Sequence, residues 1–222
     1  MDIDTVQKLY EKGEIFFNRK DWDIVIQVFT KVIKINPNEA PAYFKRGIAY
    51  YNKEDYDSAI ADYNEAVMIN PNDAGAYCNR GLAYFNKKDY YRTFANYDEA
   101  IRINPNFAEA YSNRGNAYAD KKNYNSAIVD YNEAIRINPN NAIAYKNRGI
   151  AYFRKEDYDH AIVDFNEAIR NNPDNAEAYF YRGIVYSKKG DNKQAIADYE
   201  SALKLDPNNT IYRDNLKLLR GW

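Results

Sequence analysis

Apolar residues recur along this chain at helical spacing, in two alternating kinds of segment. In residues 108–122 the apolar positions fall on one face of a helix, and residues 123–137 carry a second such pattern that stops at Pro139. The residues that form the two patterns are Ala110, Tyr111, Gly115, Ala117 and Tyr118, then Tyr124, Ala127, Ile128, Tyr131, Ala134 and Ile135. Because Gly115 and Ala127 are small, the two helices can cross closely. The pattern therefore predicts an antiparallel pair of helices.

This helix pair recurs with a period of 34 residues. The period is marked by prolines at positions 37, 71, 105, 139, 173 and 207, and by glycines at positions 13, 47, 81, 115, 149 and 183. The repeats are residues 6–39, 40–73, 74–107, 108–141, 142–175 and 176–209. A fixed period of this length indicates one supersecondary unit stacked on copies of itself. We therefore expect residues 1–222 to form a single solenoid domain.

The order of residues within each repeat resembles the tetratricopeptide repeat (TPR) family, whose pattern carries an aromatic residue, Gly, Tyr, Ala, an aromatic residue, Ala and Pro. The third repeat reads Tyr77, Gly81, Tyr84, Thr93, Tyr97, Ala100 and Pro105, and the fifth reads Tyr145, Gly149, Tyr152, Ala161, Phe165, Ala168 and Pro173. The first repeat departs from the pattern, with Val25 and Val32 where Ala is usual. The resemblance implies an all-α fold, a right-handed superhelical solenoid of six helix-turn-helix repeats. It also implies a protein that binds peptide segments of other proteins and has no catalytic activity.

The two ends of the chain differ from the repeats between them. Alanine occupies the third position of repeats two to six, where it should pack against the preceding repeat, and the first repeat has Lys8 there. Residues 210–222 predict one further helix that caps the stack, with an apolar side against the last repeat. The apolar residues of this cap are Ile211, Leu216, Leu218 and Leu219, and those expected to face water are Arg213, Asp214, Lys217 and Arg220.

The amino-acid composition argues against nucleic-acid binding, membrane insertion and metal binding. The 31 Lys and Arg residues and 32 Asp and Glu residues are spread along the chain, so no basic surface is expected to attract nucleic acid. A charged fraction of 28% argues against a membrane-inserted chain. Cys78 and His160 are single, which leaves no ligand set for a metal. We expect no cofactor, and cytoplasm is the default location, although a removed signal peptide would leave no trace.

Charged residues recur in phase with the repeat. Because a catalytic acid and base form a singular pair, recurrent carboxylates indicate architecture, and we expect no enzyme activity. The main columns are Arg46, Arg80, Arg114, Arg148 and Arg182, then Asp62, Asp130, Asp164 and Asp198, then Glu65, Glu99, Glu133 and Glu167. The arginines lie at the edge of the buried face and must be paired, with Asp the first candidate and Glu the alternative. Asn96 replaces Asp in the third repeat, so Arg80 is expected to turn to Glu99 or a neighbouring carboxylate.

One face of the first helix varies between repeats. On a helical wheel, positions two, five, six, nine, twelve and thirteen fill the arc opposite the constant residues, and we call this arc the variable face. The TPR resemblance implies that this face lines a concave groove where peptides lie. Its apolar candidates for peptide binding are Phe44, Ile48, Tyr51, Leu82 and Phe85, then Ile150, Phe153, Phe180 and Ile184. Cys78 is expected to be a small groove residue, and the apolar members predict a largely exposed apolar surface.

Asparagine occupies the sixth position of three successive repeats, as Asn79, Asn113 and Asn147. Lys45 and Tyr181 hold this position in the flanking repeats, and Asn116 lies at the ninth position. An amide side chain can both donate to and accept from the backbone of an extended chain, although asparagine can also be merely common at this position.

These features favour a non-catalytic module that binds an extended, partly apolar peptide segment of a protein partner. Two alternatives stay open. One is a structural building block that self-associates into a homo-oligomer, and the other is a regulatory scaffold subunit of an enzyme complex.

Overall fold

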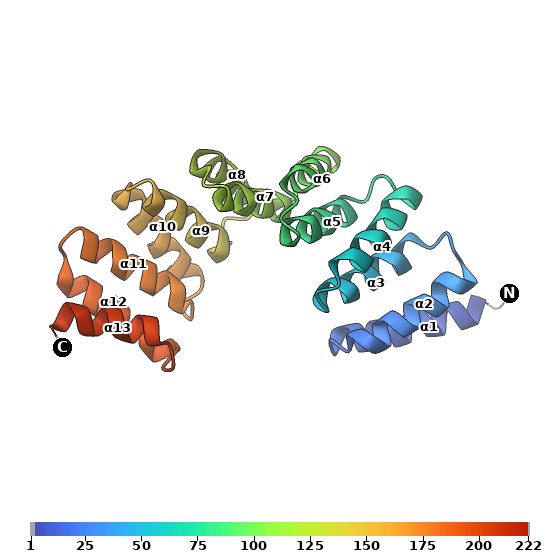
Figure 1. Cartoon of the computed structure of the whole chain (residues 1–222), viewed down its shortest axis with the longest axis horizontal. Helices are drawn as coiled ribbons and strands as arrows, with labels where there is room; N and C mark the ends of the chain where they lie inside the picture. The colour runs from blue at the N-terminus through green and yellow to red at the C-terminus, as the bar shows by residue number, and fades with distance from the viewer. Residues whose placement is uncertain (1–2, 222) are drawn as a thin grey trace. The chain divides into compact units, whose positions relative to one another are not determined.

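The computed structural model describes residues 3–221, and these residues form thirteen helices and no strand (Figure 1). The described chain divides into two compact halves, residues 3–113 and 114–221, whose boundary lies within α7 (Ala108–Asp120). The N-terminal half contains α1 (Ile3–Asn18), α2 (Trp22–Ile35), α3 (Ala40–Asn52), α4 (Tyr56–Ile69), α5 (Ala74–Asn86) and α6 (Tyr90–Ile103). The C-terminal half contains α8 (Tyr124–Ile137), α9 (Ala142–Arg154), α10 (Tyr158–Asn171), α11 (Ala176–Lys188), α12 (Asn192–Leu205) and α13 (Thr210–Arg220). The predicted all-α class, with two helices in each repeat and a terminal helix, is confirmed.

The turns between helices have a constant chemistry. Each second helix from α4 to α12 begins after an Asp or Asn whose side chain accepts a hydrogen bond from a backbone N–H of the first turn, as Asp157 does from His160. The tight turn before it requires a left-handed residue, which is Gly190 in the sixth repeat and a Lys or Glu in the others, such as Glu156 at φ 62°. Each second helix ends at the residue before Asn-Pro or Asp-Pro, where the backbone leaves the helical conformation.

Close crossing of the paired helices depends on the repeated glycine. At Gly149 an added Cβ would lie 2.9 Å from the ring of Phe165, which is fully buried. The other five repeats place the ring of a Tyr or Phe against their own glycine in the same way. The space that a larger side chain would occupy at each glycine is therefore filled by an aromatic ring of the second helix.

Successive repeats stack within each half through their first helices and the alanines at the third position. The first helices touch directly, α3 against α5 and α9 against α11. Ala42 is buried in a cluster with Val25 and Phe29 of the preceding repeat, and Ala76 is buried against Ala66 and Val67. These contacts confirm the expected role of the alanine, while Lys8, at the same position of the first repeat, is exposed.

The terminal helix α13 packs on the sixth repeat, as predicted, but through different residues. Tyr212 and Leu216 are its buried side chains, and Leu219 packs beside Leu216. Ile211 and Leu218, which were expected to cover the last repeat, are 60% and 78% exposed. The prediction was wrong for this pair because the helix rests on the side that carries Tyr212 and Leu216, and Ile211 and Leu218 lie away from that line of contact.

Candidate functional site

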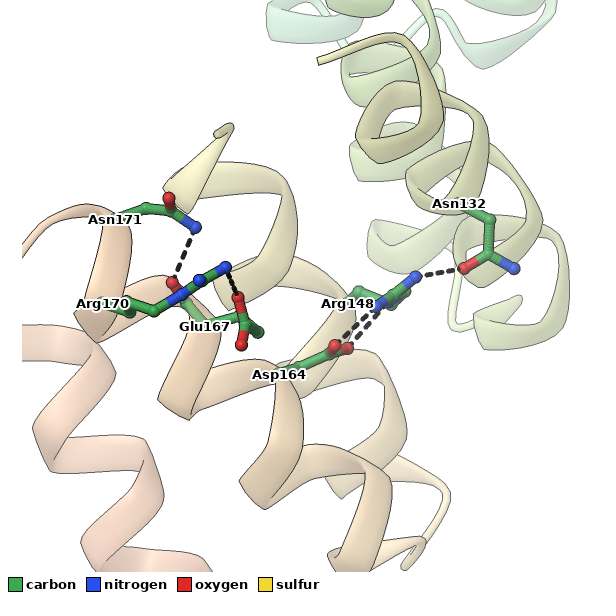
Figure 2. Close-up of polar contacts among 6 residues, drawn as sticks. All are labelled: Asn132, Arg148, Asp164, Glu167, Arg170 and Asn171. Carbon is green, nitrogen blue, oxygen red and sulfur yellow. Dashed lines mark hydrogen bonds and ion pairs between the residues drawn. The ribbon is translucent and has the colours of Figure 1, made fainter. Parts of the chain in front are cut away.

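The arginine column is paired with the aspartate column, as predicted. In α9, Arg148 donates from Nε and Nη2 to the two carboxylate oxygens of Asp164 on α10, at 2.8 and 2.6 Å (Figure 2). The same bidentate geometry joins Arg46 to Asp62, Arg114 to Asp130 and Arg182 to Asp198. Burial raises the pKa of Asp62 and of Asp164, and the hydrogen bonds from the arginine oppose that rise.

The arginines also join neighbouring repeats, a contact that the sequence analysis missed. Nη1 of Arg148 donates to Oδ1 of Asn132, one repeat earlier, at 2.6 Å (Figure 2). Equivalent bonds run from Arg46 to Thr30, from Arg80 to Asn64 and from Arg182 to Asn166. These acceptors share one repeat position, and that recurrence was the signal that could have revealed them. Each of these arginines therefore links the second helix of its own repeat to the second helix of the preceding repeat. The arginine column thus stabilises the stacking of repeats.

The third repeat differs from the expectation for Arg80. Its Nε donates to Oδ1 of Asn96 at 2.7 Å, and its Nη1 donates to Asn64, while Glu99 pairs with Arg102 on its own helix. The prediction of a carboxylate partner was wrong because Asn96 supplies an acceptor at the same place as Asp does elsewhere. Without a carboxylate beside it, burial lowers the pKa of Arg80.

The nine apolar candidates of the variable face are partly buried, so the expected largely exposed surface was wrong for them, whereas Ile143 at the second position is 61% exposed. In the N-terminal half, Phe44, Ile48 and Tyr51 pack around the buried ring of Tyr63, and Phe85 packs edge-on against Tyr90. Leu82 is also only partly exposed. Helices of the same and neighbouring repeats cover one side of each of these residues. These apolar candidates are therefore partly covered side chains and do not form a row of fully protruding ones.

The C-terminal half repeats this arrangement. Ile150, Phe153 and Tyr181 surround the buried Phe165, whose ring stacks on that of Tyr181 at a centroid distance of 6.1 Å. Phe180 and Ile184 pack beside Tyr199, and the ring of Phe180 lies 4.6 Å from that of Tyr212 on α13. Each of these predicted site residues keeps part of its surface open.

The asparagines at the sixth position donate hydrogen bonds inside the protein. Nδ2 of Asn79 donates to the carbonyl of Gly75 at 2.9 Å, and Nδ2 of Asn113 contacts the sulfur of Cys78 at 3.7 Å. In the C-terminal half, Nδ2 of Asn147 donates to Oδ1 of Asn116 at 2.9 Å, and that oxygen also accepts from the hydroxyl of Tyr131. Among the described residues nothing donates to Oδ1 of Asn79, Asn113 or Asn147. These three oxygens can therefore accept a hydrogen bond from a ligand.

Two other predicted groove residues are not available as expected: Lys45 is in an ion pair and Cys78 is buried. Lys45 forms an ion pair with Glu14 at 3.1 Å, and its Nζ lies 4.4 Å from the ring centre of Phe17. Cys78 is buried, which corrects the expectation that it lies in the groove. Burial raises the pKa of its thiol to about 12, so the sulfur is protonated and unreactive.

His160 and one small pocket both lie outside the variable face. No group of three His, Cys, Asp or Glu side chains within residues 3–221 could hold a metal ion. His160 is exposed and contacts only Asp157 and the ring of Tyr152 in the described contacts. A pocket of about 160 Å³ is lined by Lys122, Asn123, Tyr124, Asn125 and Lys155, none of which belongs to the variable face. Within the described part, no helix is both long and apolar enough to cross a bilayer.

Models of known protein families match several parts of the sequence. A model described as TPR repeat matches residues 49–88, 94–122 and 115–156. Models described as tetratricopeptide repeat match residues 28–61, 74–107 and 146–210. Together the matches extend from residue 28 to residue 210. The chain belongs to the tetratricopeptide repeat family, a family of protein-protein interaction repeats. No curated protein sequence matches it.

Solved structures share the fold. A chain in the crystal structure of the APC/C hetero-tetramer Cut9-Hcn1 is 18% identical, with a TM-score of 0.83 over 96% of this chain, which spans 42% of the length of that chain. The chain in a crystal structure of MamA is 28% identical to this chain, with a TM-score of 0.66 over 80% of this chain and 98% of MamA. YrrB, described as a TPR protein with an unusual peptide-binding site, is 21% identical, with a TM-score of 0.67 over 85% of this chain and 97% of YrrB.

Proposed function

We propose that the chain is a non-catalytic interaction module that holds an extended, partly apolar peptide segment of a partner protein against the variable face of its first helices. The observation that carries this proposal is the set of open Oδ1 acceptors on Asn79 and Asn113 in the N-terminal half and Asn147 in the C-terminal half. An amide oxygen can accept from the backbone N–H of an extended chain whatever its sequence. Backbone contacts of this kind supply affinity without selectivity.

Selectivity would come from the partly buried apolar residues beside the asparagines. Ile48, Leu82 and Phe85 lie on the variable face of the N-terminal half, and Ile150, Phe153 and Ile184 lie on that of the C-terminal half. A few such anchors usually dominate the energy of a peptide interface. The charges nearby are paired, Lys45 with Glu14 and Lys146 with Glu177, so an apolar segment fits better than a strongly charged one.

The test uses twelve-residue peptides selected from a random phage-displayed library against the wild-type chain, then measured by fluorescence anisotropy. The combined variant Asn79→Ala, Asn113→Ala, Asn147→Ala removes the acceptors of both halves. Each hydrogen bond of about 0.5–1.5 kcal/mol that a bound peptide loses should weaken its binding about twofold to twelvefold. The matched control replaces Asn72, Asn106 and Asn140, exposed residues with the same 34-residue spacing in the turns before the first helices. Equal affinity of both triple variants, with both folded, would remove the asparagines from the mechanism.

Self-association is the competing function, with a specific observation in its favour. Ile15 of α1 and Leu218 of α13 are exposed apolar residues at the first and last helices of the chain. An assembly through these helices predicts a molecular mass that rises with concentration in analytical ultracentrifugation and falls in the Ile15→Ser variant. A chain that sediments as a monomer while it binds selected peptides favours the interaction module, and with it a role as an adaptor or scaffold.

A further inference from the structure

The helix α13 keeps the register of the repeats. Counting 34 residues from the first helix of the sixth repeat places Tyr212 at the third position, Asn215 at the sixth and Leu218 at the ninth. Ile211 falls at the second position. Three of these four residues, Ile211, Asn215 and Leu218, therefore occupy positions of the variable face, where α11 carries Glu177, Tyr181 and Ile184.

The packing of α13 preserves this register in space. Tyr212 is buried and its ring lies 4.6 Å from that of Phe180 on α11, while Leu216 is buried beside Tyr199 of α12. With α13 packed in this way, Ile211 is 60% exposed and Leu218 is 78% exposed. Nδ2 of Asn215 donates to the carbonyl of Ile211 at 2.8 Å, the same bond to the residue four earlier that Asn79 makes to Gly75. The asparagine row, interrupted by Tyr181, thus resumes at Asn215.

Ile211 and Leu218 do not form the surface on which a second helix would pack, as it does in the repeats. In the six repeats the eighth position of the first helix is glycine, against which the ring of the second helix packs. The corresponding residue of α13 is Lys217, which is exposed. A lysine there blocks the close crossing that a second helix needs. Ile211 and Leu218 themselves lie at variable-face positions, opposite the constant positions against which the second helix packs in the six repeats.

We infer that α13 is the terminal part of the peptide-binding face, and that its occupant is an extended segment with an aliphatic residue at every third position. The inference rests on the proposed function. Packed helices lie about 8–10 Å apart. An extended chain in the polyproline II conformation has three residues per turn and advances about 3.1 Å per residue, so every third side chain lies on the same side about 9 Å further on, which matches the distance between neighbouring first helices. Ile150, Ile184 and Leu218 form the aliphatic series on α9, α11 and α13 that such a segment would contact.

The charges of this region define the occupant further. Lys146 and Glu177 are paired with each other across α9 and α11. Asp214, at the fifth position of α13, is exposed and forms no ion pair among the described contacts. Lys217, which is exposed and precedes Leu218 in the sequence, offsets this charge, so a segment without a strong net charge beside its aliphatic residues is complementary.

The test compares two double variants of the full chain on the same phage-selected peptides. Ile211→Ser with Leu218→Ser removes the exposed aliphatic pair of α13, and Val129→Ser with Val163→Ser removes an equally exposed pair, 61% and 58%, on the second helices α8 and α10. We expect selected peptides to show aliphatic residues three apart, and their affinity to fall about fivefold to twentyfold in the α13 variant only. Because all four side chains are exposed, both variants should keep the wild-type thermal transition.

The outcomes separate this inference from the proposed function. Peptides that lose affinity in the asparagine triple variant but not in the α13 variant would overturn the inference alone. Failure to select any peptide would overturn the proposed function itself. A change in sedimentation, with peptide affinity unchanged in the α13 variant, would show that a second copy of the chain covers this surface. Enriched peptides with no three-residue period would refute the occupant proposed here.

Discussion

Replacing Arg148 by methionine is expected to lower the stability of the C-terminal half far more than loss of a surface charge does. The substitution keeps the approximate length of the side chain but removes two bonds to Asp164 and one to Asn132. Asp164 is only 2% exposed, so its carboxylate would be left buried and unpaired. Breaking a buried ion pair in this way costs about 3–5 kcal/mol, which corresponds to a melting temperature lower by about 6–20 °C for a chain of this size.

The pH dependence gives an independent test of the same reasoning. Burial raises the pKa of Asp164 and Arg148 opposes the rise, so the pKa should be higher still in Arg148→Met. A carboxyl group whose pKa is higher in the folded state than in the unfolded state binds its proton more tightly on folding. Its contribution is therefore present below the ordinary aspartate pKa of about 4 and is lost as the pH rises through the folded-state pKa. The destabilisation should be largest near neutral pH and smaller in mild acid.

Thermal unfolding followed by circular dichroism at both pH values measures the effect, and hydrogen exchange locates it on α9 and α10. The control is Arg170→Met, which removes an exposed pair with Glu167 on one helix and should cost no more than about 1 kcal/mol (Figure 2). Adding Asp164→Asn to Arg148→Met should restore much of the loss, because Asn96 already occupies this position in the third repeat. If Arg148→Met were as stable as Arg170→Met, the structural assignment of the arginine column would be refuted.

Two further substitutions test the packing. Asn96→Asp should stabilise the N-terminal half by about 1–2 kcal/mol at neutral pH, because it supplies the carboxylate that Arg80 lacks, and a lower or unchanged urea midpoint would contradict this. Gly149→Ala should cost about 1–3 kcal/mol, since the new Cβ would lie 2.9 Å from the buried Phe165 ring. Gly75→Ala should cost less, because its new Cβ would lie 3.1 Å from the carboxylate end of the Asp73 side chain and 3.8 Å from the nearest ring atom. Equal melting temperatures for the two alanine variants would show that the crossing is not tightly packed.

Much of the fold could be read from the spacing of residues. Six in-phase copies of one pattern place the two helices of each repeat, because glycine, alanine and the aromatic ring that fills the crossing recur together. The partner of Arg148 could be predicted for the same reason, since Asp164 recurs with it at constant separation. The exceptions were single substitutions within the pattern. Asn96 kept its place in the column but changed the chemistry, so that Arg80 bonded to amide oxygens instead of a carboxylate.

The candidate site was less predictable. The helical wheel described Cys78 and Leu82 as equivalent members of one groove. In the structure Cys78 is buried and Leu82 is partly exposed. The bonds that occupy the amide groups of Asn79, Asn113 and Asn147 were also not visible in the sequence, because each depends on which acceptor lies within reach of a particular rotamer.

The sequence by itself therefore determined the repeat, the helix pairs, the closely crossing glycines and the pairing of Arg with Asp, because each of these depends on a constant interval along the chain. The tertiary structure decided how deeply each side chain of the variable face is covered, which oxygens stay open, and that Ile211 and Leu218 of α13 remain exposed. A periodic pattern states the direction in which a side chain leaves its own helix. How much of that side chain is then removed from water depends on the size and placement of side chains on the neighbouring helices.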